Sequence, residues 1–111
     1  MTIKIVNYKY HPKVRAAGYC VQRKYSPLGS PFPVKPWGPY ERGETIPLYE
    51  EWLYRKYYVE RDTKIVFTIN KLYRQWLRDG ELILVCGCKP LDCHADVIAK
   101  LLTEIFIDKL I

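Results

Sequence analysis

The sequence predicts an α/β fold, a small Rossmann-like sandwich with the element order β-β-α-α-β-α and a short mixed sheet. Short β-branched or apolar runs indicate strands, and longer segments carry apolar residues at helical spacing. A long helical segment separates the second run from the third, which favours a parallel pair of strands with a right-handed crossover. The length of 111 residues allows a single domain, residues 1–111.

Three runs are predicted strands. Residues 3–8 are β-branched and aromatic, and residues 18–23 follow a basic connection that contains Pro12. Residues 81–86 form a continuous apolar run, which is typical of a buried central strand.

Three segments are predicted helices. The first has Thr45 as its N-cap and Pro47 in its first turn. The second follows Asp62 or Thr63 and ends at residues 79–80, and the third is capped by Asp92. Their expected apolar faces are Leu48, Trp52, Leu53 and Tyr57; Ile65, Ile69, Leu72, Trp76 and Leu77; and Val97, Ile98, Leu101, Leu102, Ile105 and Phe106.

Two irregular segments should meet at one edge of the sheet. Residues 25–43 are rich in glycine and proline, and their aromatic residues Phe32, Trp37 and Tyr40 favour an ordered loop. A Cys-rich turn follows the third strand. Because parallel strands end at the same edge, and open α/β sheets bind ligands there, we expect a ligand site at this edge.

The charge distribution favours an anionic partner. The net charge is +6, yet residues 1–40 hold seven basic residues and no Asp or Glu. Such asymmetry indicates a phosphate-bearing small molecule or nucleic acid. No apolar run reaches the roughly 20 residues that span a bilayer, so we expect a cytoplasmic protein with no membrane partner. Only two Asn and two Gln occur, which is compatible with a thermophilic source.

The first candidate motif runs from Arg23 to Phe32. Arg23 supplies positive charge, Ser26 and Ser30 supply hydroxyls, and Gly29 allows backbone amides to approach a ligand. Phe32 could stack on a base. The alternative is a proline-rich turn with a structural glycine, since the pattern lacks the P-loop spacing.

The second candidate motif runs from Cys86 to Asp96 and contains Cys88. Cys93 and His94 fall in the first turn of the last helix, where the helix dipole favours an anion or a thiolate, and Asp96 follows. We take Cys93, His94 and Asp96 as candidate catalytic residues. Zinc binding is an alternative, although the ligand spacing is poor for it and we assign no metal ligand. A Cys86–Cys93 disulfide and simple packing also stay open.

The motifs together resemble a known family. Arg23, residues 26–32, residues 49–53 and residues 86–97 resemble the "domain of unknown function 4326" family, a small domain of phages and bacteria. The sequence departs from the family pattern at Gln22, where glycine is typical, at Ser30, where asparagine is typical, and at Gly87, where tryptophan is common. The resemblance implies the fold and the site, and implies no reaction or cofactor.

Three functions follow as hypotheses, and the third is a phage-type protein that binds a host protein. The first is a domain that binds a nucleotide or other phosphate-bearing ligand at the carboxyl edge of the sheet, with cleavage of a sugar–base bond as a candidate reaction. The second is a basic nucleic-acid-binding module, with or without zinc at the Cys/His cluster. The ligand and the oligomeric state are not specified by the sequence.

Overall fold

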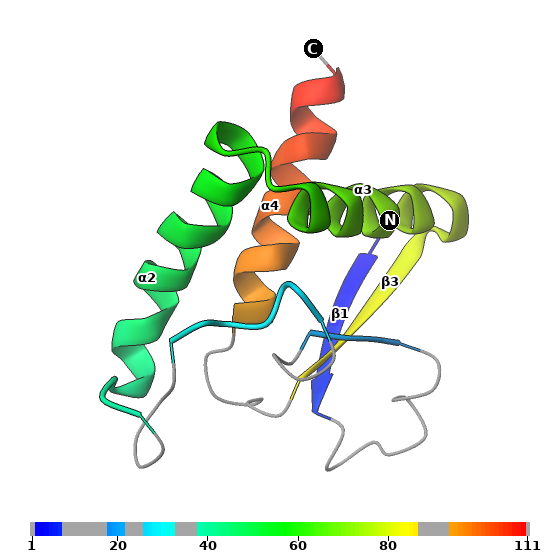
Figure 1. Ribbon diagram of the computed structural model, residues 1–111. Helices are drawn as coiled ribbons and strands as arrows, with labels where there is room; N and C mark the ends of the chain where they lie inside the picture. The colour runs from blue at the N-terminus through cyan, green and yellow to red at the C-terminus, as the bar shows by residue number, and fades with distance from the viewer. Residues whose placement is uncertain (1, 8–17, 22–25, 33–37, 87–93, 111) are drawn as a thin grey trace.

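The α/β class predicted from the sequence is confirmed by a computed structural model, which describes residues 2–7, 18–21, 26–32, 38–86 and 94–110. The elements are β1 (Thr2–Asn7), β2 (Tyr19–Cys20), α2 (Arg42–Tyr54), the π-helix η1 (Arg55–Val59), α3 (Thr63–Asp79), β3 (Glu81–Cys86) and α4 (His94–Leu110) (Figure 1). Since η1 continues α2, the elements that the structure describes follow the expected order β-β-α-α-β-α.

The described sheet is parallel and has the strand order β1-β3-β2. β1 pairs with β3 from Thr2 opposite Glu81 to Asn7 opposite Cys86, and β2 pairs with the other side of β3. The parallel pairing of the second and third strands is therefore confirmed. The prediction of a mixed sheet is wrong for the described strands, because β3 reaches its place between the two earlier strands by a helical crossover and no hairpin.

The two faces of the sheet pack differently. Leu82 and Leu84 are buried in the core that the helices form, and Ile3 and Ile5 of β1 pack against the same core. Val85, on the alternate face of β3, is also buried but lies outside that core. Burial of both faces explains why this run is continuously apolar.

The helix α2 begins four residues earlier than expected. Its N-cap is Glu41, whose backbone N–H donates to the Glu44 carboxylate at 3.3 Å. The prediction of Thr45 as N-cap is therefore wrong, and Pro47 lies in the second turn. The reason is that Glu44 satisfies the backbone donor at the helix start, so a hydroxyl cap is not needed.

The buried stripe of α2 also differs from the expected face. Tyr49, Leu53 and Tyr57 are buried at four-residue spacing, whereas Leu48 and Trp52 are only half-buried. Side chains four residues apart lie on one face of a helix, so Tyr49 replaces Leu48 at the start of the stripe.

The helix α3 begins where the sequence indicated. The Asp62 carboxylate accepts from the backbone N–H of Ile65 at 3.1 Å, and Gly80 ends the helix with φ 73°. The expected core residues are buried except for Leu77, which is 45% exposed. Tyr73 is buried instead, because it lies on the helix face shared with Ile69 and Trp76.

The helix α4 supplies much of the core. Its buried residues are Ala95, Val97, Ile98, Leu101, Leu102 and Ile105, and Phe106 packs at the margin. The expected face is confirmed, while the expected cap Asp92 lies outside the described residues. None of the helices in the described ranges is both long and apolar enough to cross a membrane.

Candidate functional site

The last helix begins at the carboxyl edge of the sheet. His94, the first residue of α4, lies with its ring Nε2 2.7 Å from the backbone oxygen of Val21. Val21 directly follows β2, and its own N–H donates to the Val85 oxygen at 3.0 Å, which extends the strand pairing by one residue. Since a carbonyl only accepts, Nε2 carries the proton in this contact. The bond ties the positive end of the α4 dipole to the end of β2.

Tyr49 joins this contact from α2. Its hydroxyl donates to the buried backbone oxygen of Leu28 at 2.5 Å. Its ring also packs edge-to-face on the His94 ring, with centroids 5.1 Å apart. We call Val21, Leu28, Tyr49 and His94 the edge cluster. It holds together the end of β2, the loop of residues 26–32, α2 and α4, segments that are distant in the sequence.

The loop of residues 26–32 is held by its own hydrogen bonds. The Ser26 hydroxyl accepts from the backbone N–H of Leu28 at 3.0 Å and lies 2.7 Å from the Tyr19 hydroxyl. The Gly29 N–H donates to the Ser26 carbonyl at 3.1 Å. Ser26 is 8% exposed and Gly29 is buried. These two predicted ligand residues therefore shape the turn, and their polar groups are used inside it.

Two more of the predicted ligand residues, Ser30 and Phe32, lie at the end of the same loop, and Phe32 packs against the hydrophobic core. Ser30 is half-buried, and its hydroxyl accepts from the Phe32 N–H at 3.2 Å. Phe32 is also half-buried and packs edge-to-face on Tyr40, with centroids 5.6 Å apart. The Phe32 ring is thus fixed in position beside the loop without being fully covered.

Several predicted site residues lie outside the described part of the chain. Arg23 follows Val21 by two residues, and Cys93 precedes His94; neither is described, nor is Cys88. The side chain of Cys86 is not described either, so zinc binding and the Cys86–Cys93 disulfide stay predictions. Among the residues that the structure does describe, no three His, Cys, Asp or Glu side chains form a group able to hold a metal ion.

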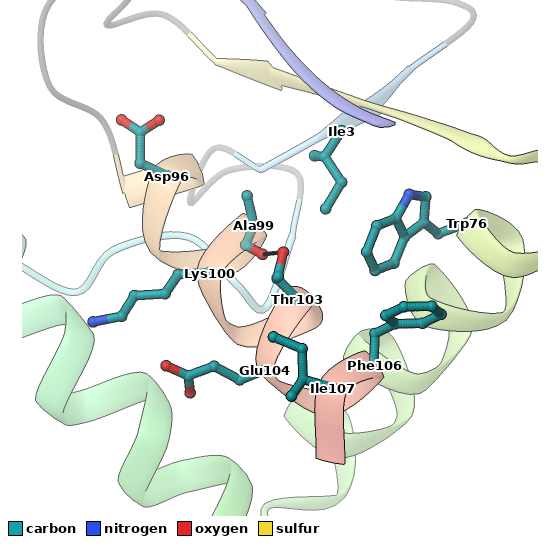
Figure 2. Close-up of a pocket in the computed structure, with 9 residues that line it drawn as sticks. All are labelled: Ile3, Trp76, Asp96, Ala99, Lys100, Thr103, Glu104, Phe106 and Ile107. Carbon is teal, nitrogen blue, oxygen red and sulfur yellow. Dashed lines mark hydrogen bonds between the residues drawn. The ribbon is translucent and has the colours of Figure 1, made fainter. Parts of the chain in front are cut away.

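The structure does not place Asp96 beside the His94 ring. Asp96 lies two residues further along α4, about 200° around the helix axis. It lines one end of an open groove of about 780 Å³ between β1, α3 and α4 (Figure 2). The wall at the other end is apolar and includes Ile3, Trp76 and Phe106. His94 and Asp96 therefore face different surroundings.

Two of the other polar side chains of this groove, Lys100 and Glu104, lie near residues of α2, while the Thr103 hydroxyl donates to the Ala99 carbonyl of α4 itself. Lys100 forms an ion pair with Glu50, and the hydrogen bond with this carboxylate raises the pKa of Lys100. Burial, followed by the nearby Glu104 carboxylate, raises the pKa of Tyr54 well above its ordinary value. Tyr54 therefore stays protonated at neutral pH. The groove combines an apolar wall with side chains that are engaged in holding α2 to α4.

Sequence reasoning missed two side chains of the site. The sequence pattern places Tyr49 in a motif and Tyr19 in a strand, and it assigns neither of them a contact at the predicted ligand site. The signal for Tyr49 was its position four residues before Leu53 and eight before Tyr57, which puts it on the buried stripe. No local signal pairs Tyr19 with Ser26, because that contact depends on the turn that follows β2.

Comparison with known proteins gives a family and no further relative. The model of the family described as "Domain of unknown function (DUF4326)" matches residues 6–104. No curated protein and no solved structure matches the chain significantly. The matched range covers every element of the edge cluster.

Proposed function

The chain belongs to the DUF4326 family, and from this premise we propose that it binds a nucleotide or another phosphate-bearing ligand at the carboxyl edge of its sheet. The observation that carries the proposal is the edge cluster. The bonds from His94 to Val21 and from Tyr49 to Leu28 hold a loop and a helix N-terminus at the edge where open α/β sheets bind ligands. We also propose that the ligand binds at the carboxyl ends of the strands in the way that is typical of Rossmann-like folds.

Each residue has a defined role in the proposed site. Arg23, two residues after Val21, supplies a guanidinium for phosphate, and the positive end of α4 adds to the attraction. Ser30 and Phe32, which are both half-buried, contact the ligand through their exposed parts, with the Phe32 ring beside the base. Ser26 and Gly29 hold the turn in shape.

His94 is the candidate acid–base group. Its Nε2 proton is directed at the Val21 oxygen, which fixes the orientation of the ring, and imidazole is the side chain most often used to transfer protons. In the proposed reaction water attacks the sugar carbon, the sugar–base bond breaks, and the base leaves with its electron pair and a proton. Asp96 lies about 200° around the α4 axis from His94 and lines the groove, so we do not assign it this role. We infer that the reaction takes place in the cytoplasm.

A thermal-shift experiment tests binding. Nucleoside monophosphates, nucleosides, ribose 5-phosphate and inorganic phosphate are compared as probes. A probe at 100 times its dissociation constant stabilises the fold by about 2.7 kcal/mol, so a rise in Tm of several degrees is expected with the monophosphates. Nucleosides that lack the phosphate should give a smaller rise.

Matched variants separate a specific site from general charge. Arg23→Gln and Lys109→Gln each remove one positive charge, and Lys109 lies near the far end of α4. The first should abolish the shift and the second should leave it unchanged. An equal loss in both variants, or no shift with any phosphate-bearing probe, contradicts the proposal.

Chromatography tests the reaction. The protein is incubated with the nucleoside monophosphate that binds best, and free base and ribose 5-phosphate are measured. His94→Gln should reduce release of base at least tenfold while Asp96→Asn retains it. If the wild-type protein binds the nucleoside monophosphate but releases no free base, the hydrolytic step is excluded and the protein is a binding domain.

A second candidate function is the nucleic-acid-binding module. It is favoured by the seven positive charges and the absence of Asp and Glu in residues 1–40. DNA binding measured at increasing salt concentration tests this function, because the affinity should fall steeply as the salt concentration rises. Metal analysis of untagged protein tests whether the module also binds zinc.

A further inference from the structure

The outer face of α3 carries a continuous stripe of basic residues. At about 100° per residue, six positions fall within an arc of about 100° on the side of the helix opposite the core. Five of the side chains are exposed and Gln75 is half-buried. The stripe contains no Asp or Glu. Its members, which we call the α3 stripe, are Lys64, Phe67, Lys71, Arg74, Gln75 and Arg78.

We propose that the α3 stripe binds single-stranded nucleic acid. The inference is independent of the ligand site at the edge cluster. It also places the contact on α3, which crosses the molecule in front of α4 in Figure 1, and not on residues 1–40. Three features of the stripe support this binding: the spacing of its cations, its one exposed aromatic ring, and the scarcity of carboxylates beside it.

The cations are arranged along a line that suits a phosphate backbone. From Lys64 to Arg78 the helix rises about 21 Å, at about 1.5 Å per residue, and Lys71 and Arg74 lie between them. Lys71, Arg74, Gln75 and Arg78 line a shallow hollow of about 490 Å³. Guanidinium and ammonium groups are the usual protein donors to phosphate oxygens.

Among the residues that the structure describes, one carboxylate pairs with a cation of the stripe. Asp79 lies at the end of α3 and accepts from Arg78 Nε at 2.8 Å and Nη2 at 3.1 Å. Within the described ranges, no carboxylate forms an ion pair with Lys64, Lys71 or Arg74. Three cations of the stripe are therefore available for an anion.

Phe67 identifies the kind of anion. Its side chain is 63% exposed, and it lies one helical turn from Lys64 on one side and from Lys71 on the other. An aromatic ring between cations is the pattern with which proteins stack a base and hold the adjoining phosphates. The bases of a duplex are already stacked on one another, so a single strand fits the stripe better.

The pattern fits a membrane surface or an acidic protein less well. A helix that lies in a membrane interface buries a broad apolar face, whereas the α3 stripe has one apolar residue. A protein interface usually has an apolar centre with charges at its rim. Here the cations extend along the middle of the stripe.

Fluorescence anisotropy with a labelled 12-nucleotide oligothymidylate tests the proposal. Binding should be measurable at 25 mM salt and should weaken at 200 mM salt. Each phosphate contact in a single strand contributes about 0.7 to the slope of log affinity against log salt concentration. The double variant Lys71→Gln/Arg74→Gln should therefore bind at least tenfold more weakly at 25 mM salt and lower the slope by about 1.4.

The control removes the same charge elsewhere. Lys4 on β1 and Lys109 on α4 are exposed positions outside the stripe, and Lys4→Gln/Lys109→Gln should change affinity less than twofold. Phe67→Ala leaves the charge unchanged and should weaken binding by about 5-fold or more, since stacking on one base contributes at least about 1 kcal/mol. Far-UV circular dichroism verifies that each variant is folded.

One substitution should increase affinity. Asp79→Asn removes the carboxylate that holds Arg78, so it should strengthen oligonucleotide binding several-fold. Glu51→Gln, at an exposed position on α2, adds the same charge and should have little effect. If Asp79→Asn raises the affinity for the oligonucleotide and Glu51→Gln does not, the result supports binding at the stripe, because an unfolded variant would not bind more tightly.

Any one of several results would overturn the proposal. They are absence of oligonucleotide binding at 25 mM salt, equal losses in the stripe and control double variants, tighter binding of a 12-base-pair duplex than of the single strand, and binding of phosphatidylserine vesicles without oligonucleotide binding. Wild-type binding that the stripe variants leave unchanged also contradicts it, and would direct attention to residues 1–40.

Discussion

Tyr49 shows how much one side chain contributes to the edge cluster. It is fully buried, it bonds the Leu28 carbonyl, and it packs on the His94 ring. A buried carbonyl without a donor costs about 1–3 kcal/mol, so the hydroxyl matters beyond its own bond. Tyr49 thus links the α2 stripe to the loop that carries Ser30 and Phe32.

Gly18 is a second residue at which a single substitution should change the stability of the fold. A Cβ there would lie 2.7 Å from Val85 Cγ2, 2.9 Å from Ile83 Cγ2 and 3.1 Å from the Ile83 oxygen. We therefore expect Gly18→Ala to lower the free energy of unfolding by about 1–3 kcal/mol through overpacking. Urea unfolding measures the change.

The double variant is the control for this prediction. Val85→Ala removes the closest atom, so Gly18→Ala/Val85→Ala should lose less stability than the sum of the two single variants. Strictly additive losses would show that the close approach to Val85 does not cause the effect.

At the scale of elements, the turn between α2 and α3 is held by charge. The π-helix η1 ends at Glu60, whose carboxylate accepts from Arg55 Nε and Lys56 Nζ, each at 3.0 Å. The hydrogen bond from Lys56, together with the charges of both bases, holds the pKa of Glu60 below its ordinary value. Arg61 follows with φ 53° and donates to the Tyr57 carbonyl at 3.1 Å. These contacts let α3 leave α2 at a sharp angle.

The lowered pKa predicts how stability depends on pH. Because Glu60 is more acidic in the folded state, its stabilisation is complete above the ordinary carboxyl pKa and is lost as the pH falls through the folded pKa. Glu60→Gln should therefore have a lower Tm than the wild type at neutral pH, and the two Tm values should converge on acidification. Calorimetry between about pH 7 and pH 3 measures this.

Glu51→Gln is the matched control, since Glu51 is an exposed glutamate on the same helical segment. Its Tm difference from the wild type should be small and nearly independent of pH. If both variants gave the same pH dependence, the Glu60 pair would have no specific role.

At the scale of the whole molecule, all the helices and the sheet share one core. Leu84 at its centre is fully buried, and the cluster extends to Leu53, Ile69 and Leu101 on α2, α3 and α4. A structure with one shared core is expected to unfold in a single cooperative transition.

Leu84→Ala tests this cooperativity. Deleting a buried leucine side chain costs about 2–5 kcal/mol, which is a large share of the total stability of a small domain. Far-UV circular dichroism and tryptophan fluorescence should report the same shifted midpoint. Ile83→Ala, at a half-buried position of the same strand, should cost less. Separate transitions for the two signals would contradict a single core.

Much of this fold follows from the sequence alone. The continuous apolar run of β3, the cap at Asp62 with the stop at Gly80, and the apolar face of α4 were all predicted from local pattern. These features depend on helix and strand periods and on short-range hydrogen bonds, which neighbouring residues specify.

Only the tertiary structure decided which residues meet. It brought Tyr49 to His94, turned Ser26 inward to Tyr19, and placed Asp96 in a groove that His94 does not line. It also showed that Leu77 is exposed where Tyr73 is buried. The physical reason is that contacts between distant segments depend on how helices rotate and pack against the sheet, and a periodic pattern fixes the face of a helix without fixing its partner.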